Sequence, residues 1–262
     1  MLEGKIAVVT GGASGIGAAI SRLLASKGAH VVVTSEQPLS TLEPFCAKIV
    51  EAGGSASAMV CDVTDRGAIV TLIAEVERRH SRLDILVNCA GLFHRAALEA
   101  MDDGRIEAMF AVNALGPIRL VKAALPIMRR GGGGAIVNIA SGAAVLGVEG
   151  CAVYAATKAA LSHFTRTLAP ELRRSGIRIN AVAPGSVRTP MLGFKSDELT
   201  PEQVQSLAKR EAGTMSPYGN PMIDPADIAE VVLFLVSDAA RALQGSMVLA
   251  DQGISSAMPA PG

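Results

Sequence analysis

The stretch Thr10-Gly11-Gly12-Ala13-Ser14-Gly15-Ile16-Gly17 decides the fold of this 262-residue chain. It follows a short apolar run and opens a segment with helical periodicity, which is the strand–turn–helix context of a phosphate-binding turn. Glycines let the backbone turn sharply and approach a pyrophosphate, and the free N–H groups at a helix start favour negative charge. The sequence therefore predicts a dinucleotide site here, formed by Gly11, Ser14, Gly15, Ile16 and Gly17.

Short runs rich in Val, Ile and Ala alternate with longer helical patterns along the chain. Most runs are continuously apolar, as expected for strands that helices cover on both faces. The predicted strands are residues 6–10, 30–34, 56–60, 85–88, 135–139, 178–183 and 247–250. The predicted helices are residues 15–27, 39–52, 66–80, 104–129, 152–175 and 225–237. This order predicts an α/β fold, a single-domain, Rossmann-like, doubly wound parallel sheet of about seven strands.

The composition argues against several classes of protein. Lys and Arg together number 24, as do Asp and Glu, so no net charge favours binding to nucleic acid or to an anionic membrane. No uninterrupted apolar run reaches the roughly 18 residues of a membrane span, and the N-terminus lacks a signal-peptide pattern. The cysteines are isolated, so neither a disulfide framework nor a metal site is expected. We expect instead a reduced, cytoplasmic location. These cysteines are Cys46, Cys61, Cys89 and Cys151.

A tyrosine and a lysine occur one helical turn apart in Tyr154-Ala-Ala-Thr-Lys158. Residues at i and i+4 share a helix face, so the ammonium should favour the phenolate and lower the pKa of Tyr154. Ser141 follows the predicted strand 135–139, and its hydroxyl can hold a substrate oxygen beside Tyr154. The pattern predicts acid–base chemistry at the phenol, with Lys158 tuning it electrostatically.

The chain resembles the short-chain dehydrogenase/reductase family over nearly its whole length. The resemblance rests on Thr-Gly-x-x-x-Gly-x-Gly, on Tyr-x-x-x-Lys with a serine thirteen residues earlier, and on Asn88-Cys89-Ala90-Gly91, where Cys89 replaces the family's usual second Asn. It implies that Asn113, Ser141, Tyr154 and Lys158 are catalytic, with Asn113 positioning a water linked to Lys158. It further implies that Asp62, Val63, Asn88, Ala90, Gly91, Tyr154, Lys158, Pro184, Gly185, Val187 and Thr189 bind an NAD or NADP cofactor.

The choice of cofactor is read at the end of the second predicted strand. NAD-binding folds place an acid there for the ribose 2′-OH, whereas NADP binders offer a basic residue. The family position of the acid is occupied by Ser35, and Glu36 follows it; neither Ser14 nor the residues after the strand are basic. We expect NAD, with NADP as the alternative.

Residues after the strand ends are expected to form the substrate site, with Ser141, Tyr154, Leu146 and Met191 as its members. A Pro- and Gly-rich stretch with a helix-like piece near residues 201–211 predicts a substrate lid around residues 185–224. The domain is expected to span residues 1–254, with a flexible tail at 255–262. Arg188 is interpreted as a surface residue or, alternatively, as a grip for an anionic substrate.

The predicted function is interconversion of a secondary alcohol and a ketone by hydride transfer. An NADPH-dependent 3-ketoacyl-carrier reductase and a non-catalytic dinucleotide-sensing regulator remain as alternatives. The resemblance also implies a homotetramer or dimer packed through residues 104–129 and 152–175 and the C-terminal strand.

Overall fold

The fold is a seven-stranded parallel sheet in the computed structural model, which describes residues 1–194 and 222–256. The strand order is β3-β2-β1-β4-β5-β6-β7. The predicted fold class is confirmed, and every predicted strand agrees with an observed one to within one residue at each end. The strands are β1 (Ile6–Thr10), β2 (His30–Ser35), β3 (Ser55–Val60), β4 (Ile85–Asn88), β5 (Gly134–Ile139), β6 (Ile177–Pro184) and β7 (Met247–Ala250).

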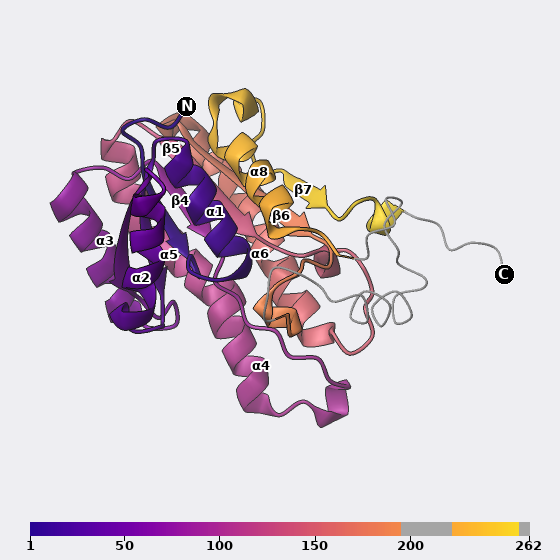
Figure 1. Cartoon of the computed structure of the whole chain (residues 1–262). Helices are drawn as coiled ribbons and strands as arrows, with labels where there is room; N and C mark the ends of the chain where they lie inside the picture. Colours follow the sequence, from indigo (N-terminus) through magenta and orange to yellow (C-terminus); the bar gives the residue numbers. More distant parts are fainter. Residues whose placement is uncertain (195–221, 257–262) are drawn as a thin grey trace.

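Helices cover both faces of the sheet (Figure 1). One face carries α1 (Gly15–Ser26), α2 (Leu39–Glu51) and α8 (Pro225–Val236), whose buried residues form one apolar cluster with the strands. The other carries α3 (Arg66–His80), α5 (Gly116–Arg130) and α6 (Ala152–Leu172). Parallel strands need such crossovers, and the resulting three layers bury the sheet.

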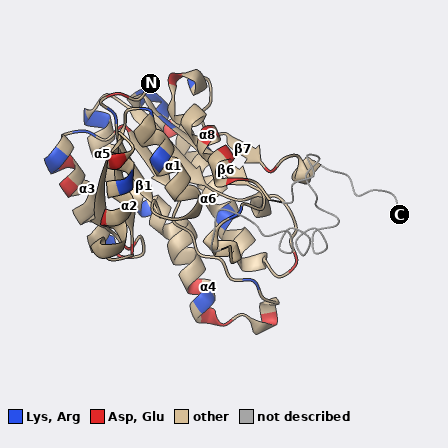
Figure 2. Cartoon of the chain, in the orientation of Figure 1, with Lys and Arg blue, Asp and Glu red and all other residues tan. Residues whose placement is uncertain are grey.

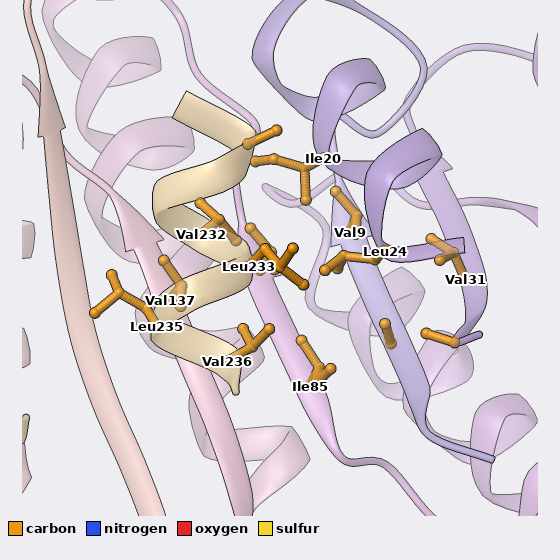
Figure 3. Close-up of a cluster of buried hydrophobic side chains, with 14 of the residues drawn as sticks. Val9, Ile20, Leu24, Val31, Ile85, Val137, Val232, Leu233, Leu235 and Val236 are labelled. Atoms are coloured by element: carbon orange, nitrogen blue, oxygen red, sulfur yellow. The ribbon is translucent and has the colours of Figure 1, made fainter. Parts of the chain in front are cut away.

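The core between α1, α8 and the sheet explains why the strands read as apolar runs (Figure 3). Ile20 and Leu24 of α1 and Val232 of α8 point toward Val9 in β1, and all four are fully buried. Neighbouring strand residues point to opposite faces, so Val8 belongs to the cluster on the other side. Each such side chain contributes about 1.5–3 kcal/mol on burial.

The helix predicted over residues 104–129 is wrong as a single helix. It consists of α4 (Asp103–Phe110), a π-helical turn η2 (Ala111–Leu115) and α5. A π turn accommodates one extra residue, which hydrophobic periodicity does not reveal. The helix predicted over residues 152–175 also ends early, because α6 stops at Leu172 and a 3₁₀ turn follows over Arg173–Ser175.

Two predictions fall largely outside the described residues. Of the predicted lid at 185–224, residues 195–221 are not described, and these include the helix-like piece near 201–211. Of the predicted tail at 255–262, residues 257–262 are not described, whereas Ile254–Ser256 form a 3₁₀ turn.

Charge is mixed over the described surface, and both signs occur on α3 and α4 (Figure 2). One helical stretch, Asp103–Arg130, is long and apolar enough to cross a membrane by length and composition alone. Its α5 portion packs Leu120, Ala124 and Ile127 into the core, the behaviour of a helix that covers a sheet.

Candidate active site

The glycine turn after β1 has the shape that a dinucleotide phosphate requires. Gly11 has a positive φ of 62°, and a Cβ there would lie 3.0 Å from the Cα of Ala90. A Cβ on Gly17 would lie 2.1 Å from the carbonyl oxygen of Gly11. In the described chain, the Ser14 side chain caps none of the N–H groups that open α1. The turn therefore offers free donors in a cradle that side chains would fill, which fits a pyrophosphate.

The turn lies where the strand order reverses. β1 pairs with β2 on one side and with β4 on the other, and this switch point is where open α/β sheets bind their ligands. The hydroxyl of Thr10 accepts hydrogen bonds from the backbone N–H groups of Cys89 (3.0 Å) and Ala90 (3.1 Å). The ends of β1 and β4 are thereby fixed together, which places Ala90 and Gly91 beside the glycine turn.

Asn88 lies beneath this edge. Its side-chain amide donates to Asn138 Oδ1 at 2.7 Å, and Asn138 in turn donates to Thr165 Oγ1 at 2.8 Å. All three residues are buried. Asn88, predicted to bind the cofactor, therefore joins β4, β5 and α6 through its side chain.

Ser141, Tyr154 and Lys158 converge at the carboxyl ends of β5 and β4. Ser141 follows β5, and its side chain interacts with that of Tyr154 on α6. The Nζ atom of Lys158 lies 5.8 Å from the centroid of the Tyr154 ring and donates to the carbonyl oxygen of Ile139 at 2.9 Å. A Cβ on Gly91 would lie 3.7 Å from the same Nζ atom, so Lys158 also borders the β4 turn. The predicted acid–base group thus forms one compact cluster.

Burial dominates the protonation of this cluster. Lys158 is only 4% exposed, and burial lowers its pKa to about 8, so it is mainly an ammonium at neutral pH. Burial raises the pKa of Tyr154, and the hydrogen bond with Ser141 offsets part of that rise. The expectation that Lys158 lowers the pKa of Tyr154 below its usual value is therefore wrong for this chain, because desolvation of the phenolate outweighs the opposing effects.

Asn113 lies in the π turn, and its side chain is committed to the protein. Its Oδ1 atom accepts from the N–H of Leu92 at 2.8 Å, and its amide donates to the Leu92 carbonyl (2.8 Å) and to Thr157 Oγ1 (3.1 Å). Thr157 donates to the carbonyl of Tyr154 at 2.7 Å. Both amide protons are used, and the side chain fixes the β4 turn to α6. That Asn113 positions a water linked to Lys158 stays a prediction.

The residues predicted on the adenosine side lie along the ends of β2 and β3. Ser35 is buried, and its hydroxyl accepts from the backbone N–H of Gln37 at 3.0 Å, whereas the exposed Glu36 accepts from the Gln37 side chain. Asp62 Oδ1 accepts from the N–H of Thr64 at 2.8 Å, and Val63 packs under α5. Glu36 and Asp62 are therefore both exposed carboxylates at these strand ends, while the Ser35 hydroxyl is used within its own turn.

The turn after β6 approaches the glycine turn from the other side. The N–H of Gly185 donates to the Ala250 carbonyl at 3.1 Å, and Val187 forms a parallel bridge with Ile223. A Cβ on Gly15 would lie 3.0 Å from Thr189 Cγ2, so Thr189 packs directly over that glycine. The predicted cofactor residues Pro184, Gly185, Val187 and Thr189 thus line the same edge as the turn after β1.

Apolar side chains lie at Tyr154 and near the two turns beside it. The ring of Phe93 meets the Tyr154 ring edge-on, with centroids 4.9 Å apart. Leu146 lies beside Gly142, and Met191 Cε lies 3.4 Å from a Cβ placed on Gly91. The predicted substrate residues Leu146 and Met191 therefore flank the cluster. Among residues 1–194 and 222–256, no group of three or more His, Cys, Asp or Glu side chains could hold a metal.

Sequence reasoning missed the polar residues that hold the site together, Thr10, Thr157 and Asn138. Thr10 and Asn138 lie at strand ends in otherwise apolar runs, where a buried polar group needs a partner. Thr157 directly precedes Lys158 on the helix. These signals were present, but the partners that join these residues to other elements are 27 to 80 residues away in sequence, beyond the reach of local spacing.

Known proteins resemble the chain along its whole length. A family model described as enoyl-(acyl carrier protein) reductase matches residues 11–255. The chain is 38% identical over 240 residues to 2,3-dihydro-2,3-dihydroxybenzoate dehydrogenase of Bacillus subtilis, covering 91% of both proteins. It is 35% identical over 253 residues to 3-oxoacyl-(acyl-carrier-protein) reductase of Thermotoga maritima, covering 97% of this chain and 98% of the relative.

A solved structure shares the fold throughout. It is described as an NAD(P)-dependent gluconate 5-dehydrogenase from Beutenbergia cavernae with bound NADP at low occupancy, and the TM-score is 0.88 at 33% identity over 98% of both chains. With the glycine turn, the Ser141–Tyr154–Lys158 cluster and the switch-point location in place, these matches are decisive. The chain belongs to the short-chain dehydrogenase/reductase family of NAD(P)-binding oxidoreductases.

Proposed function

We propose that this protein interconverts a secondary alcohol and a ketone, with a nicotinamide dinucleotide as hydride donor or acceptor. The observation that carries the proposal is the cluster of Ser141, Tyr154 and Lys158 at the same sheet edge as the glycine turn. The turn would hold the pyrophosphate, and the β6 turn with Thr189 would hold the nicotinamide half. When bound, the dinucleotide supplies the hydride chemistry, and the protein handles the proton.

Tyr154 is the proton-transfer group in this proposal. Because burial raises its pKa, Tyr154 is a phenol at neutral pH, the form that donates a proton to a carbonyl oxygen during reduction. In oxidation, the phenolate accepts the hydroxyl proton of the alcohol. The Ser141 hydroxyl holds the substrate oxygen, and the ammonium of Lys158 favours the phenolate through its charge.

The walls of the site favour a cyclic, mostly apolar secondary alcohol. Phe93 packs against the Tyr154 ring, and Leu146 and Met191 add apolar surface beside Gly142 and Gly91. One relative is named for a cyclic dihydrodiol, which is consistent with a ring lying against Phe93. We therefore propose ring alcohols or diols as the substrate class.

The test is Tyr154→Phe, assayed by nicotinamide absorbance with a panel of cyclic and open-chain secondary alcohols and both coenzymes. Turnover should fall at least about 100-fold, the usual contribution of a general acid–base group, because only the ionisable hydroxyl is removed. Coenzyme affinity, measured by calorimetry, should stay within about twofold of the unchanged protein. Turnover that survives the change would reject the role of Tyr154.

For the coenzyme we propose NAD ahead of NADP, because Glu36 is the exposed carboxylate at the end of β2 and would repel a 2′-phosphate. Glu36→Gln should weaken NAD several-fold, about the worth of one hydrogen bond to a charged group, and should improve NADP. Equal effects on both coenzymes, measured by titration, would contradict this assignment. The control is Glu51→Gln at the end of α2, which should change neither affinity.

A 3-ketoacyl-carrier reductase is the second candidate, favoured by the match to the Thermotoga maritima reductase. It predicts a preference for NADPH and activity on carrier- or thioester-linked ketones, so the same assay panel separates it from the first. We also propose a homotetramer or dimer packed through residues 104–129 (in α4, η2 and α5), residues 152–175 and β7. Exposed apolar side chains on this part of the surface, Phe110, Leu115 and Leu249, support it.

A further inference from the structure

Arg188 forms an ion pair with Asp224, across the gap in the described chain. The Nη2 atom of Arg188 binds Asp224 Oδ2, and the Arg188 side chain is only 22% exposed. Asp224 is also the N-cap of α8, because its Oδ1 atom accepts from the N–H of Ala226 at 2.9 Å. Arg188, interpreted from the sequence as a surface residue, is half-buried and paired. Its guanidinium is bound to a carboxylate that is itself fixed to a helix.

Backbone bonds align the same two segments. The N–H of Arg188 donates to the Ile223 carbonyl at 3.0 Å, and the N–H of Ile223 donates to the Ser186 carbonyl at 2.8 Å. Val187 and Ile223 are both buried in the core beneath this bridge. The ion pair thus completes a short parallel pairing that joins the end of β6 to the start of α8.

The residues directly after Arg188 reach the glycine turn and the β4 turn. Thr189 packs over Gly15, and Met191 lies against Gly91. Neither contact is made by a residue of a regular strand or long helix, so their placement depends on what fixes Arg188. The backbone bonds and the ion pair together tie this point to the start of α8, and the ion pair is the side-chain part of that connection.

We propose that Arg188 and Asp224 are positioning residues for the nicotinamide half of the coenzyme. The pair holds Thr189 over Gly15 and so sets the distance between the turn after β6 and the glycine turn, where the nicotinamide half would bind. This inference rests on the proposed function, because it presupposes a bound nicotinamide dinucleotide. It stands beside the alternative in which Arg188 grips an anionic substrate, because the ion pair uses one Nη of the guanidinium and the buried Nε has no hydrogen-bond partner among the described residues.

The experiment compares ligands with and without the nicotinamide ring. NADH, NADPH, ADP-ribose and the 2′-phosphate of ADP-ribose are each titrated into the protein by calorimetry, and their affinities are compared. The proteins are the unchanged chain, Arg188→Met, Arg188→Lys and Asp224→Asn. Asparagine remains a good N-cap, so Asp224→Asn removes the charge while keeping the cap of α8. Loss of one half-buried ion pair should weaken the full coenzyme about fivefold or more. ADP-ribose affinity should stay within about twofold, because its binding turn is untouched.

Arg188→Lys should recover part of the coenzyme affinity, since it keeps the charge. The KM for coenzyme should rise with the measured Kd in Arg188→Met and Asp224→Asn. The matched control is Asp102→Asn, where another N-cap aspartate pairs with an arginine, Arg105, on the exposed end of α4. Asp102→Asn should change the affinity neither for the coenzyme nor for ADP-ribose.

A coenzyme-to-ADP-ribose affinity ratio that stays constant in Arg188→Met and Asp224→Asn would overturn the inference, even if both variants melt at lower temperature. A variant that does not fold would bind neither ligand, and the other variant then decides. If the unchanged protein binds ADP-ribose and NADH or NADPH but turns over no alcohol or ketone, the proposed reaction fails while this inference stands. If it binds no dinucleotide at all, both are overturned.

Discussion

The two edges of the sheet use polar residues in opposite ways. At the carboxyl edge, the start of α1 is uncapped by a side chain and Glu36 is exposed, so groups remain available to a ligand. At the amino edge, Asp84 is bound by Arg82, by Lys5 (3.3 Å) and by the N–H of Ile6 (2.9 Å). The N–H groups that open α1 and the Glu36 carboxylate are thus accessible at the carboxyl edge, while the Asp84 carboxylate at the amino edge is bonded within the protein.

Histidines strengthen this contrast. At the start of β2, both ring nitrogens of His30 bind serines of β3, Ser55 at 2.7 Å and Ser57 at 3.0 Å, and the ring lies 4.7 Å from that of His80. The same sheet therefore carries accessible polar groups at its carboxyl edge and internally bonded polar groups at its amino edge. Mutations at the carboxyl edge should affect activity more than stability, and those at the amino edge should do the reverse.

The largest effect is expected for Lys158→Met. Removing the buried ammonium should lower kcat about 100-fold or more, as when one preorganised electrostatic partner of the reacting group is lost. Because Lys158 is almost fully buried, methionine avoids the desolvation cost of the charge, and the melting temperature should hold or rise. Kinetics and calorimetry check the two halves. A loss of stability large enough to account for the loss of activity would contradict the claim that changes at the carboxyl edge affect activity more than stability.

Asp84→Asn tests the opposite edge. Burial alone would raise the pKa of Asp84, but hydrogen bonds from Arg82 and Ile6 outweigh it and hold the pKa below its usual value. The charged form is therefore the stabilising one, and its contribution is lost only as the pH falls through that low pKa. Losing the buried charge should cost about 3 kcal/mol of unfolding free energy in urea at pH 7.

The kcat of the folded Asp84→Asn protein should remain unchanged. Glu77→Gln is the control, because Glu77 pairs with Arg130 on the exposed surface and should leave the urea midpoint where it was. Equal destabilisation by the two changes would show that the amino edge has no special role.

The smallest effect concerns His30. Burial lowers its pKa, and the neighbouring His80 lowers it further. The folded protein therefore binds fewer protons than the unfolded chain near the usual histidine pKa of about 6.5. Stability is complete above that pH and decreases as the pH falls below it. The urea midpoint of the unchanged protein should decrease between pH 7.5 and 5.5, and His30→Gln should reduce that slope; an equal slope would assign the acid sensitivity elsewhere.

Much of the fold could be predicted from the sequence because its signals are local. The continuous apolar runs located all seven strands, and the glycine turn located the start of α1. The Tyr154–Lys158 spacing predicted that both side chains share one helix face, and in the structure they lie together beside Ser141.

The remainder depends on contacts between distant parts of the chain. Arg188 and Asp224 are 36 residues apart, and Asn113 finds its partner in Leu92, 21 residues earlier. The direction of the Tyr154 pKa depends on how deeply the ring is buried, which spacing on a helix does not encode. Local patterns therefore identified the groups proposed to react, whereas the side chains that hold them in place became visible only in three dimensions.

The π turn at Ala111–Leu115 gives the long helix a built-in phase correction. Met109 before the turn and Leu120 after it are both fully buried, although an extra residue separates the two halves. Deleting Ala114 would let the segment relax into regular α-helix with α4 and α5 in nearly the same orientation, because the π turn absorbs one extra residue. The helix could be shortened by one residue there and still seat α5, but the bulge that holds Asn113 on the Leu92 backbone would be lost.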